Sequence, residues 1–176
     1  MKNLTIKSII FTLLFFQFSV SKSNAQTEKE TIDFLNTMFV TYCTPMPDNP
    51  FTHQAAPMKY IVSTKIDPDS NSKVIVFDCY VSNRMLSTYL FHPKSINSIT
   101  ITPNEYNSTI FVLRILNKDG TVKYIPFDHK EDYSYKDFIQ IPMTTSLEKT
   151  NRVKKGIIHL LELNGVEFGN ENLFKD

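Results

Sequence analysis

The residues best suited to chemistry are the four histidines, which lie far apart in the sequence as His53, His92, His129 and His159. Zinc sites usually take His or Cys ligands in close pairs, about two to four residues apart. The chain contains no His-x-His, His-x-x-x-His or Cys-x-x-Cys pattern, so the sequence predicts no metal site. One alternative function is a hydrolase-like enzyme with a site assembled from dispersed groups such as Asp78, His92, His129 and His159.

Asp78 interrupts a segment that is apolar on both sides of it. If it were buried without a partner, the pKa of its carboxyl would rise, as is common for functional carboxylates. The other interpretation is that Asp78 faces solvent or pairs with a basic neighbour such as Arg84 or Arg114. Both interpretations stay open.

Two further patterns have oxygen or hydroxyl groups at suggestive spacing. Asp128, Glu131 and Asp132 could hold a hard cation, but their loop lacks the glycine and the alternating oxygen ligands of a calcium loop. Ser-x-x-Lys occurs at residues 70–73 and 146–149, without the companion motifs of the penicillin-binding enzymes. A solvated loop explains the acidic residues better, and the Ser-x-x-Lys patterns are better explained as chance matches. The sequence therefore predicts no catalytic residue.

Apolar side chains in a proline-rich segment are the better candidates for ligand contact. Residues 44–57 contain Pro45, Pro47, Pro50 and Pro57, which remove amide donors and exclude a helix or a central strand. Such a loop buries apolar side chains poorly, so it could form a lip over a ligand or partner groove. The predicted contact residues in and beside this loop are Met46, Phe51, His53 and Met58.

Residues 1–25 have the organisation of a cleaved signal peptide. Lys2 and Lys7 precede an apolar run at residues 9–20, and small residues at 23–25 suit a signal peptidase. The run is about a dozen residues long, short of the roughly 20 that a membrane-spanning helix needs. The sequence therefore predicts an exported protein, periplasmic or extracellular, whose mature chain has no transmembrane segment.

The mature chain, residues 26–176, is long enough for one domain with its own core. The full chain has 19 Lys and Arg against 18 Asp and Glu, and cleavage removes Lys2, Lys7 and Lys22 but no acidic residue. Without a basic surplus, nucleic-acid binding and adsorption to an anionic membrane lose their usual electrostatic basis. The composition indicates no cofactor, and it leaves the partner as a protein, a peptide or a small apolar ligand.

Cys43 and Cys79 are the only cysteines in the chain. Export permits a disulfide between them, and closing that loop would stabilise the fold by about 3–4 kcal/mol on the chain-entropy model. The alternative, a buried free thiol at Cys79 within its apolar segment, stays open.

Helical spacing marks both ends of the mature chain, over residues 27–42 and 145–164. Each segment begins with a Thr that is followed three residues later by a Glu, the capping-box pattern, so Thr27 and Thr145 are the predicted N-caps. Gly165 is the predicted stop of the second helix. The face that this helix is predicted to bury consists of Val153, Ile157, Leu160 and Leu161.

The segments between the helices have the periodicity of strands. Apolar residues on both faces predict that residues 73–81 form a central strand. Asp119-Gly120 predicts a hairpin that joins residues 109–116 to residues 121–127. Because no helix separates the strands, the sheet is predicted to be antiparallel. The predicted strands cover residues 58–66, 73–81, 86–91, 96–102, 109–116, 121–127 and 138–141.

The closing run at residues 151–165, with Lys154-Lys155 followed by His159-Leu160, resembles the last helix of small exported proteins typical of Bacteroidota. The order of one helix, about seven strands and a capped helix also resembles a pleckstrin-homology-like barrel. The resemblance implies a single α+β domain over residues 26–176, with a bent antiparallel sheet or small barrel of about seven strands. In it, the C-terminal helix caps the sheet and the N-terminal helix is an addition. The resemblance transfers no functional residue.

The sequence thus contains the pattern of a complete fold but no recognisable catalytic motif. We therefore predict a secreted or periplasmic, non-enzymatic binding module for a peptide, a protein or a small apolar ligand. A carrier that holds a lipid-like ligand in the barrel mouth is a further alternative.

Overall fold

The computed structural model describes residues 27–43, 58–105, 107–118, 120–128 and 131–168. These residues form two helices and antiparallel strands in two sheets, so the predicted α+β class is confirmed. The predicted signal peptide and the proline-rich loop at 44–57 lie outside the described residues. No helix in the described ranges combines the length and the apolar composition needed to cross a membrane.

The larger sheet has five strands in the order β1-β2-β3-β6-β7. β2 pairs with β1 on one side and β3 on the other, which confirms the prediction that it is central. The short strand β7 was not predicted. The strands of this sheet are β1 (Met58–Asp67), β2 (Ser72–Val81), β3 (Arg84–Phe91), β6 (Val122–Pro126) and β7 (Ser134–Lys136).

The smaller sheet has the order β4-β5-β8, from β4 (Ile96–Pro103), β5 (Phe111–Asn117) and β8 (Phe138–Met143). A short 3-10 helix, η1 (Pro93–Ser95), leads from β3 into β4. Only Asp137 separates β7 from β8, so the chain passes there from the larger sheet to the smaller one. Among the described strands the two sheets stay separate and do not close into the predicted barrel.

The predicted hairpin between residues 109–116 and 121–127 is wrong. β5 pairs with β4 and β8, whereas β6 pairs with β3 and β7, so the two segments belong to different sheets. The amide of Asn117 donates instead to the carbonyl of Asp137, at 2.7 Å, which holds the end of β5 beside the junction of the sheets. Gly120, at φ 60°, supplies the predicted turn. The turn was predicted correctly, but its pairing partners were not.

α2 (Glu28–Tyr42) begins as predicted: the Thr27 hydroxyl accepts from the Glu30 amide, and the Glu30 carboxylate accepts from the Thr27 amide. For α3 (Leu147–Leu163) the predicted N-cap, Thr145, is wrong. The cap is Ser146, whose hydroxyl accepts from the Lys149 amide at 3.3 Å. Ser146 directly precedes the first helical residue with an extended backbone, the conformation of an N-cap, and an equally suitable hydroxyl at that position displaces the earlier threonine.

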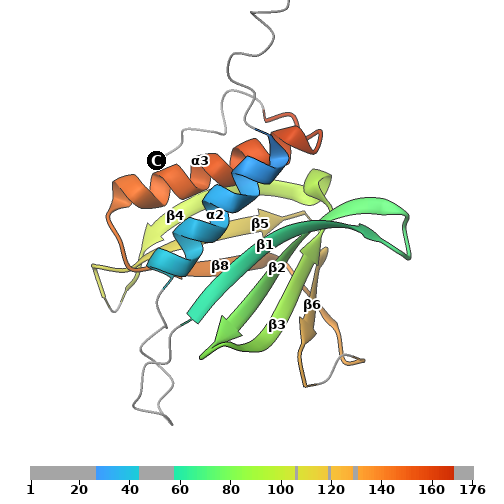
Figure 1. Cartoon of the computed structure of the whole chain (residues 1–176), viewed down its shortest axis with the longest axis horizontal. Coiled ribbons are helices and arrows are strands. Elements are labelled where there is room, and N and C mark those ends of the chain that lie inside the picture. Colours follow the sequence, from blue (N-terminus) through green and yellow to red (C-terminus); the bar gives the residue numbers. More distant parts are fainter. Residues whose placement is uncertain (1–26, 44–57, 106, 119, 129–130, 169–176) are drawn as a thin grey trace, which may run out of the picture.

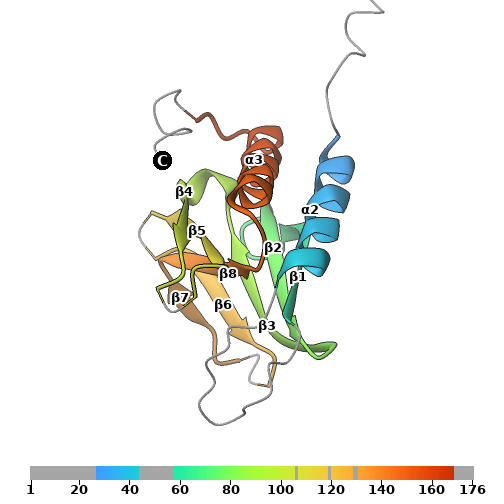
Figure 2. The same ribbon diagram turned by 90° about the vertical axis from the view of Figure 1, so that its left-hand side faces the viewer.

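One apolar core joins both helices to both sheets. The predicted face of α3, made of Val153, Ile157, Leu160 and Leu161, is buried in it as expected. Gly156 allows α3 to lie directly against α2, because a Cβ at this position would come within 2.9 Å of the Phe34 ring. Figures 1 and 2 show the helices side by side, α2 beside β1 and α3 over β4 and β5.

Candidate functional site

The outer face of the five-stranded sheet, opposite the helices, carries a second apolar cluster. Side chains alternate between the two faces of a strand, so Phe77 points into the main core whereas Val74 and Val76 point outwards. Leu90 of β3 and Ile125 of β6 pack with these two valines. The strand that the sequence marked as apolar on both faces thus supplies two separate clusters.

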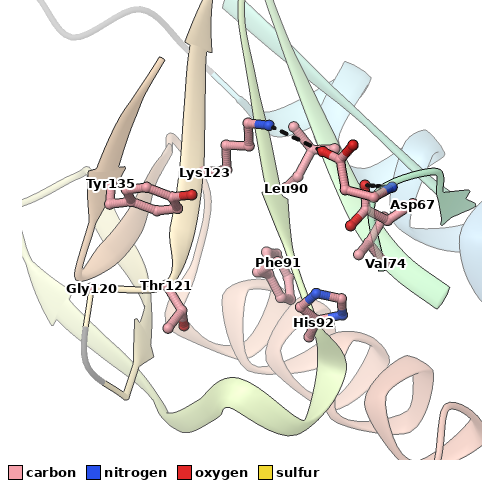
Figure 3. A pocket seen from close by; sticks show the side chains of 10 residues that line it. Asp67, Val74, Leu90, Phe91, His92, Gly120, Thr121, Lys123 and Tyr135 are labelled. Atoms are coloured by element: carbon pink, nitrogen blue, oxygen red, sulfur yellow. Dashed lines mark hydrogen bonds and ion pairs between the residues drawn. The ribbon is translucent and has the colours of Figure 1, made fainter. Parts of the chain in front are cut away.

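A pocket of about 510 Å³ opens at one end of this outer cluster. Its floor consists of the buried side chains of Val74 and Leu90, and it also reaches Phe91 at the end of β3, whose ring belongs to the main core. Its polar walls come from the end of β1 and the turn after it, the residue after β3, the loop before β6, β6 itself, and β7. The residues of these walls are Asp67, Asp69, His92, Gly120, Thr121, Lys123 and Tyr135, most of which Figure 3 labels.

The wall from the β1–β2 turn is acidic. A carboxylate oxygen of Asp67 accepts from the Ser70 hydroxyl at 2.7 Å, and this hydrogen bond holds the pKa of the Asp67 carboxyl below its usual value. Asp69 lies 3.9 Å from the Lys123 ammonium across the pocket mouth. Asp67 therefore stays ionised at neutral pH and presents a carboxylate to the pocket.

The opposite wall is aromatic. Tyr135 of β7 lies across from β1 in the order of the sheet, and its side chain is 61 % exposed. Its ring meets the Tyr133 ring edge to face at 5.8 Å between centroids. The Lys123 ammonium lies over that same Tyr133 ring, 4.5 Å from the centroid. The pocket thus combines an apolar floor, a carboxylate wall and an exposed tyrosine.

His92 is held at the pocket by a hydrogen bond between its Nδ1 and the Ser72 hydroxyl, at 3.1 Å. Ser72 in turn bonds the Ser70 hydroxyl at 2.7 Å, and Ser70 bonds Asp67. Ser72 does not line the pocket, so this chain orients the imidazole and does not present a serine nucleophile to a ligand.

Of the predicted contact residues, Met46, Phe51 and His53 lie outside the described residues. Met58 is described: it begins β1, is half-buried and packs against the main core. It does not line the pocket on the outer face. The structure therefore places a candidate site at residues that the sequence did not single out, apart from His92.

The dispersed residues considered for a hydrolase do not converge where they are described. Asp78 accepts a hydrogen bond from the Thr88 hydroxyl at 2.6 Å, a partner different from Arg84 and Arg114, which one of the two interpretations had offered as examples. His92 follows Thr88 by four positions, just after the end of β3, which is about 13 Å along an extended strand. His159 lies on α3, on the other side of the sheet, with its ring 3.6 Å from the Glu162 carboxylate.

Cys43 and Cys79 are free thiols in the structure, and both are buried. Burial raises the pKa of each thiol. Cys79 lies opposite Tyr60 in the pairing of β2 with β1, and Cys43 forms an isolated bridge with Met143 of β8. The two cysteines thus belong to the core around β1 and not to the pocket.

The acidic loop after β6 carries no metal-ligand cluster in the part of the chain that the structure describes. Asp128 pairs instead with Arg84, at 3.0 Å. His129 lies outside the described residues.

The chain matches no protein-family model, no curated protein and no solved structure.

The sequence contained one usable signal for the pocket. Residues 74 and 76 are apolar on the face of β2 that does not enter the main core, and the acidic turn at 67–71 follows β1 directly. Tyr135 and Lys123 gave no such signal, because only the pairing of β6 with β3 and β7 brings them to the same face.

Proposed function

We propose that this protein is an exported, non-enzymatic binding module that holds a small ligand in the pocket on the outer face of its five-stranded sheet. The observation that carries the proposal is the combination of an apolar floor with converging polar groups in a cavity of about 510 Å³. Cavities of roughly 300–1,000 Å³ with this composition are the usual sites for small molecules.

The way the pocket is built supports binding. Val74 and Leu90 are at most 8 % exposed, so the floor is fixed before a ligand arrives. A preformed site avoids the entropy cost of ordering side chains on binding. Hydrogen bonds within the β1–β2 turn hold the acidic wall in the same way.

Export and a relation to pleckstrin-homology-like domains are parts of the proposal that rest on the sequence. The support is the signal-peptide pattern at residues 1–25 and the order of a helix, antiparallel strands and a capped C-terminal helix. The proposal includes no catalytic step, because Ser72, the hydroxyl bonded to His92, lies outside the pocket lining. A lipid-carrier role has less support, since the Phe77 ring packs in the interior against both the Phe39 and the Phe91 rings.

A fragment screen by two-dimensional NMR tests the proposal. We expect fragments that bind to shift the backbone amides of Val74, Leu90 and Thr121, which belong to three separate segments around the pocket. Thr121→Trp, which places a large ring at the exposed rim, is expected to weaken binding about tenfold or more, because it occupies the ligand volume.

Leu86→Ala is the matched control, since Leu86 is a 50 % exposed residue of the same sheet that does not line the pocket. This variant is expected to bind like the wild type. Fragments that shift only amides remote from the pocket, or that bind Thr121→Trp and wild type equally, would contradict the proposed site.

A further inference from the structure

We propose that the ligand of this pocket is a neutral molecule with an apolar body and a hydroxyl group, and that this hydroxyl donates a hydrogen bond to Nε2 of His92. This inference rests on the proposed binding function and deepens it, because it names the chemical class of the ligand. It follows from the direction of the hydrogen bonds that end at His92.

The hydrogen-bond chain from Asp67 to His92 has a fixed direction. The Asp67 carboxylate is ionised at neutral pH and can only accept, so the Ser70 hydroxyl is the donor in their 2.7 Å bond. A hydroxyl carries one proton, so Ser70 accepts in its 2.7 Å bond with Ser72, and Ser72 is the donor there. Ser72 then has no proton left for His92, and the imidazole Nδ1–H must donate to the Ser72 oxygen, at 3.1 Å.

This direction sets the tautomer of His92. A neutral imidazole has one N–H group and one acceptor nitrogen, so a proton on Nδ1 leaves a lone pair on Nε2. Nδ1 bonds Ser72, which does not line the pocket, whereas His92 itself does. No group among the described residues forms a hydrogen bond with Nε2. Nε2 is therefore an acceptor that is left to a ligand.

The place of His92 in the sheet puts this acceptor beside the apolar floor. His92 follows the end of β3 with an extended backbone, so it shares the outer face with Leu90, about 7 Å along the strand. Val76 lies opposite Leu90 in the pairing of β2 with β3, and two positions further on Val74 lies opposite His92. Figure 3 shows His92 next to this floor. A small molecule can therefore lie on the floor and reach Nε2.

The other polar groups of the pocket favour an acceptor-only ligand less. The Thr121 hydroxyl both accepts and donates within its own loop, at 2.9 and 3.0 Å. The Lys123 ammonium lies 3.9 Å from the Asp69 carboxylate. A ligand carboxylate would face the lone pair of Nε2 and the charge of Asp67, and it would compete with Asp69 for Lys123.

A charged amine is also a donor, but it suits this acceptor less well than a hydroxyl. The imidazole is neutral, so an ammonium would leave water without gaining a counter-ion at His92. Lys123 lies opposite Leu90 in the pairing of β3 with β6 and brings a like charge to the floor. A neutral hydroxyl loses less on leaving water, and one acceptor satisfies its proton.

Four probes that share a phenyl ring on a short chain test the class of the ligand: phenethyl alcohol, phenethyl methyl ether, phenylacetate and phenethylamine. Binding is measured at about pH 8, above the range in which a free imidazole titrates. We expect the alcohol to shift the pocket amides and to bind about threefold to tenfold more tightly than the ether, which keeps the oxygen but has no proton to donate. The acid and the amine are expected to bind more weakly than the alcohol.

Ser72→Ala tests whether the hydrogen-bond chain sets the acceptor, because Ser72 does not line the pocket. The imidazole nitrogen chemical shifts of His92 should report a proton on Nδ1 in the wild type and a mixture of tautomers in this variant. The preference for the alcohol over the ether should fall towards onefold, while the ether binds as before. His92→Phe, which removes the acceptor and keeps a ring, should abolish the same preference. Ser63→Ala is the control, since Ser63 lies on the same outer face and does not line the pocket.

The outcomes separate the inference from the function beneath it. If the ether, the acid or the amine binds at the pocket as tightly as the alcohol, the hydroxyl assignment is overturned and the binding site stands. A wild-type imidazole with its proton on Nε2 would overturn the direction of the chain and the inference with it. If neither the four probes nor the fragment screen shifts any pocket amide, both the inference and the proposed function fail.

Discussion

At the scale of single residues, burial decides which side chains of this protein can react. The thiols of Cys43 and Cys79 are 8 % and 2 % exposed, and burial raises the pKa of both. Since the thiolate is the reactive form, a buried thiol with a raised pKa is protected twice. The two cysteines are therefore expected to behave as small apolar side chains in the folded protein.

Alkylation measures this protection. We expect iodoacetamide at about pH 8 to label the native cysteines at least about tenfold more slowly than those of the protein in guanidinium chloride. Intact-mass analysis without reductant should then show both thiols labelled after unfolding. Rapid labelling of the native protein would contradict the burial, and unlabelled cysteines in denaturant would reveal the disulfide that the sequence left open.

At the scale of elements, a side chain of the helix α2 forms hydrogen bonds with the edge strand β1, where a further strand could otherwise pair. β1 is an edge of the five-stranded sheet, and its Val62 backbone is buried. The Asn36 side chain of α2 supplies both partners: its oxygen accepts from the Val62 amide at 2.6 Å, and its nitrogen donates to the Val62 carbonyl at 3.1 Å. One side-chain amide thus closes the edge of the sheet against further strands.

Replacement of Asn36 by Ala leaves a buried amide and a buried carbonyl without partners. We expect the free energy of unfolding to fall by about 1–3 kcal/mol, which urea denaturation can measure. The neighbouring Thr37→Ala is the control, because the Thr37 hydroxyl bonds only the Asp33 carbonyl of its own helix, at 2.8 Å. Equal stability of Asn36→Ala and Thr37→Ala would refute the role of the amide.

The same elements show how far the sequence predicts this fold. Helices and most strands follow from local periodicity, and the capping box at Thr27 is confirmed, whereas the same local pattern at Thr145 misses the cap of α3 by one residue. Pairing between distant strands was not predictable in this way. Residues 109–127 look like a hairpin locally, but buried surface on both sides of β5 is better covered by β4 and β8. The candidate pocket depends on the pairing of distant strands. The sequence alone therefore predicted ligand contact at the loop of residues 44–57 instead.

At the scale of the whole molecule, one acidic side chain joins the start of α2 to two strands. Glu28, at the start of α2, accepts from the Thr64 hydroxyl of β1 at 2.6 Å and pairs with Lys73 of β2. The side chain of Asn164, at the end of α3, also favours its ionised form. Burial by itself raises the pKa of Glu28, but these partners outweigh it and hold the pKa below the ordinary value of 4.5.

This shift links the stability of the fold to pH. Because the folded pKa of Glu28 lies below the unfolded one, its contribution is present above about pH 4.5 and is lost as the pH falls through the folded pKa. Glu28→Gln should therefore lower the free energy of unfolding at pH 7 by about 1 kcal/mol, with allowance for solvent around the pair. The difference from wild type should shrink steadily in urea titrations below about pH 4.5. Glu105→Gln, in the exposed loop after β4, is the control and should match wild type throughout. A Glu28→Gln deficit that persists unchanged at acidic pH would show that the side chain acts through packing and not through its charge.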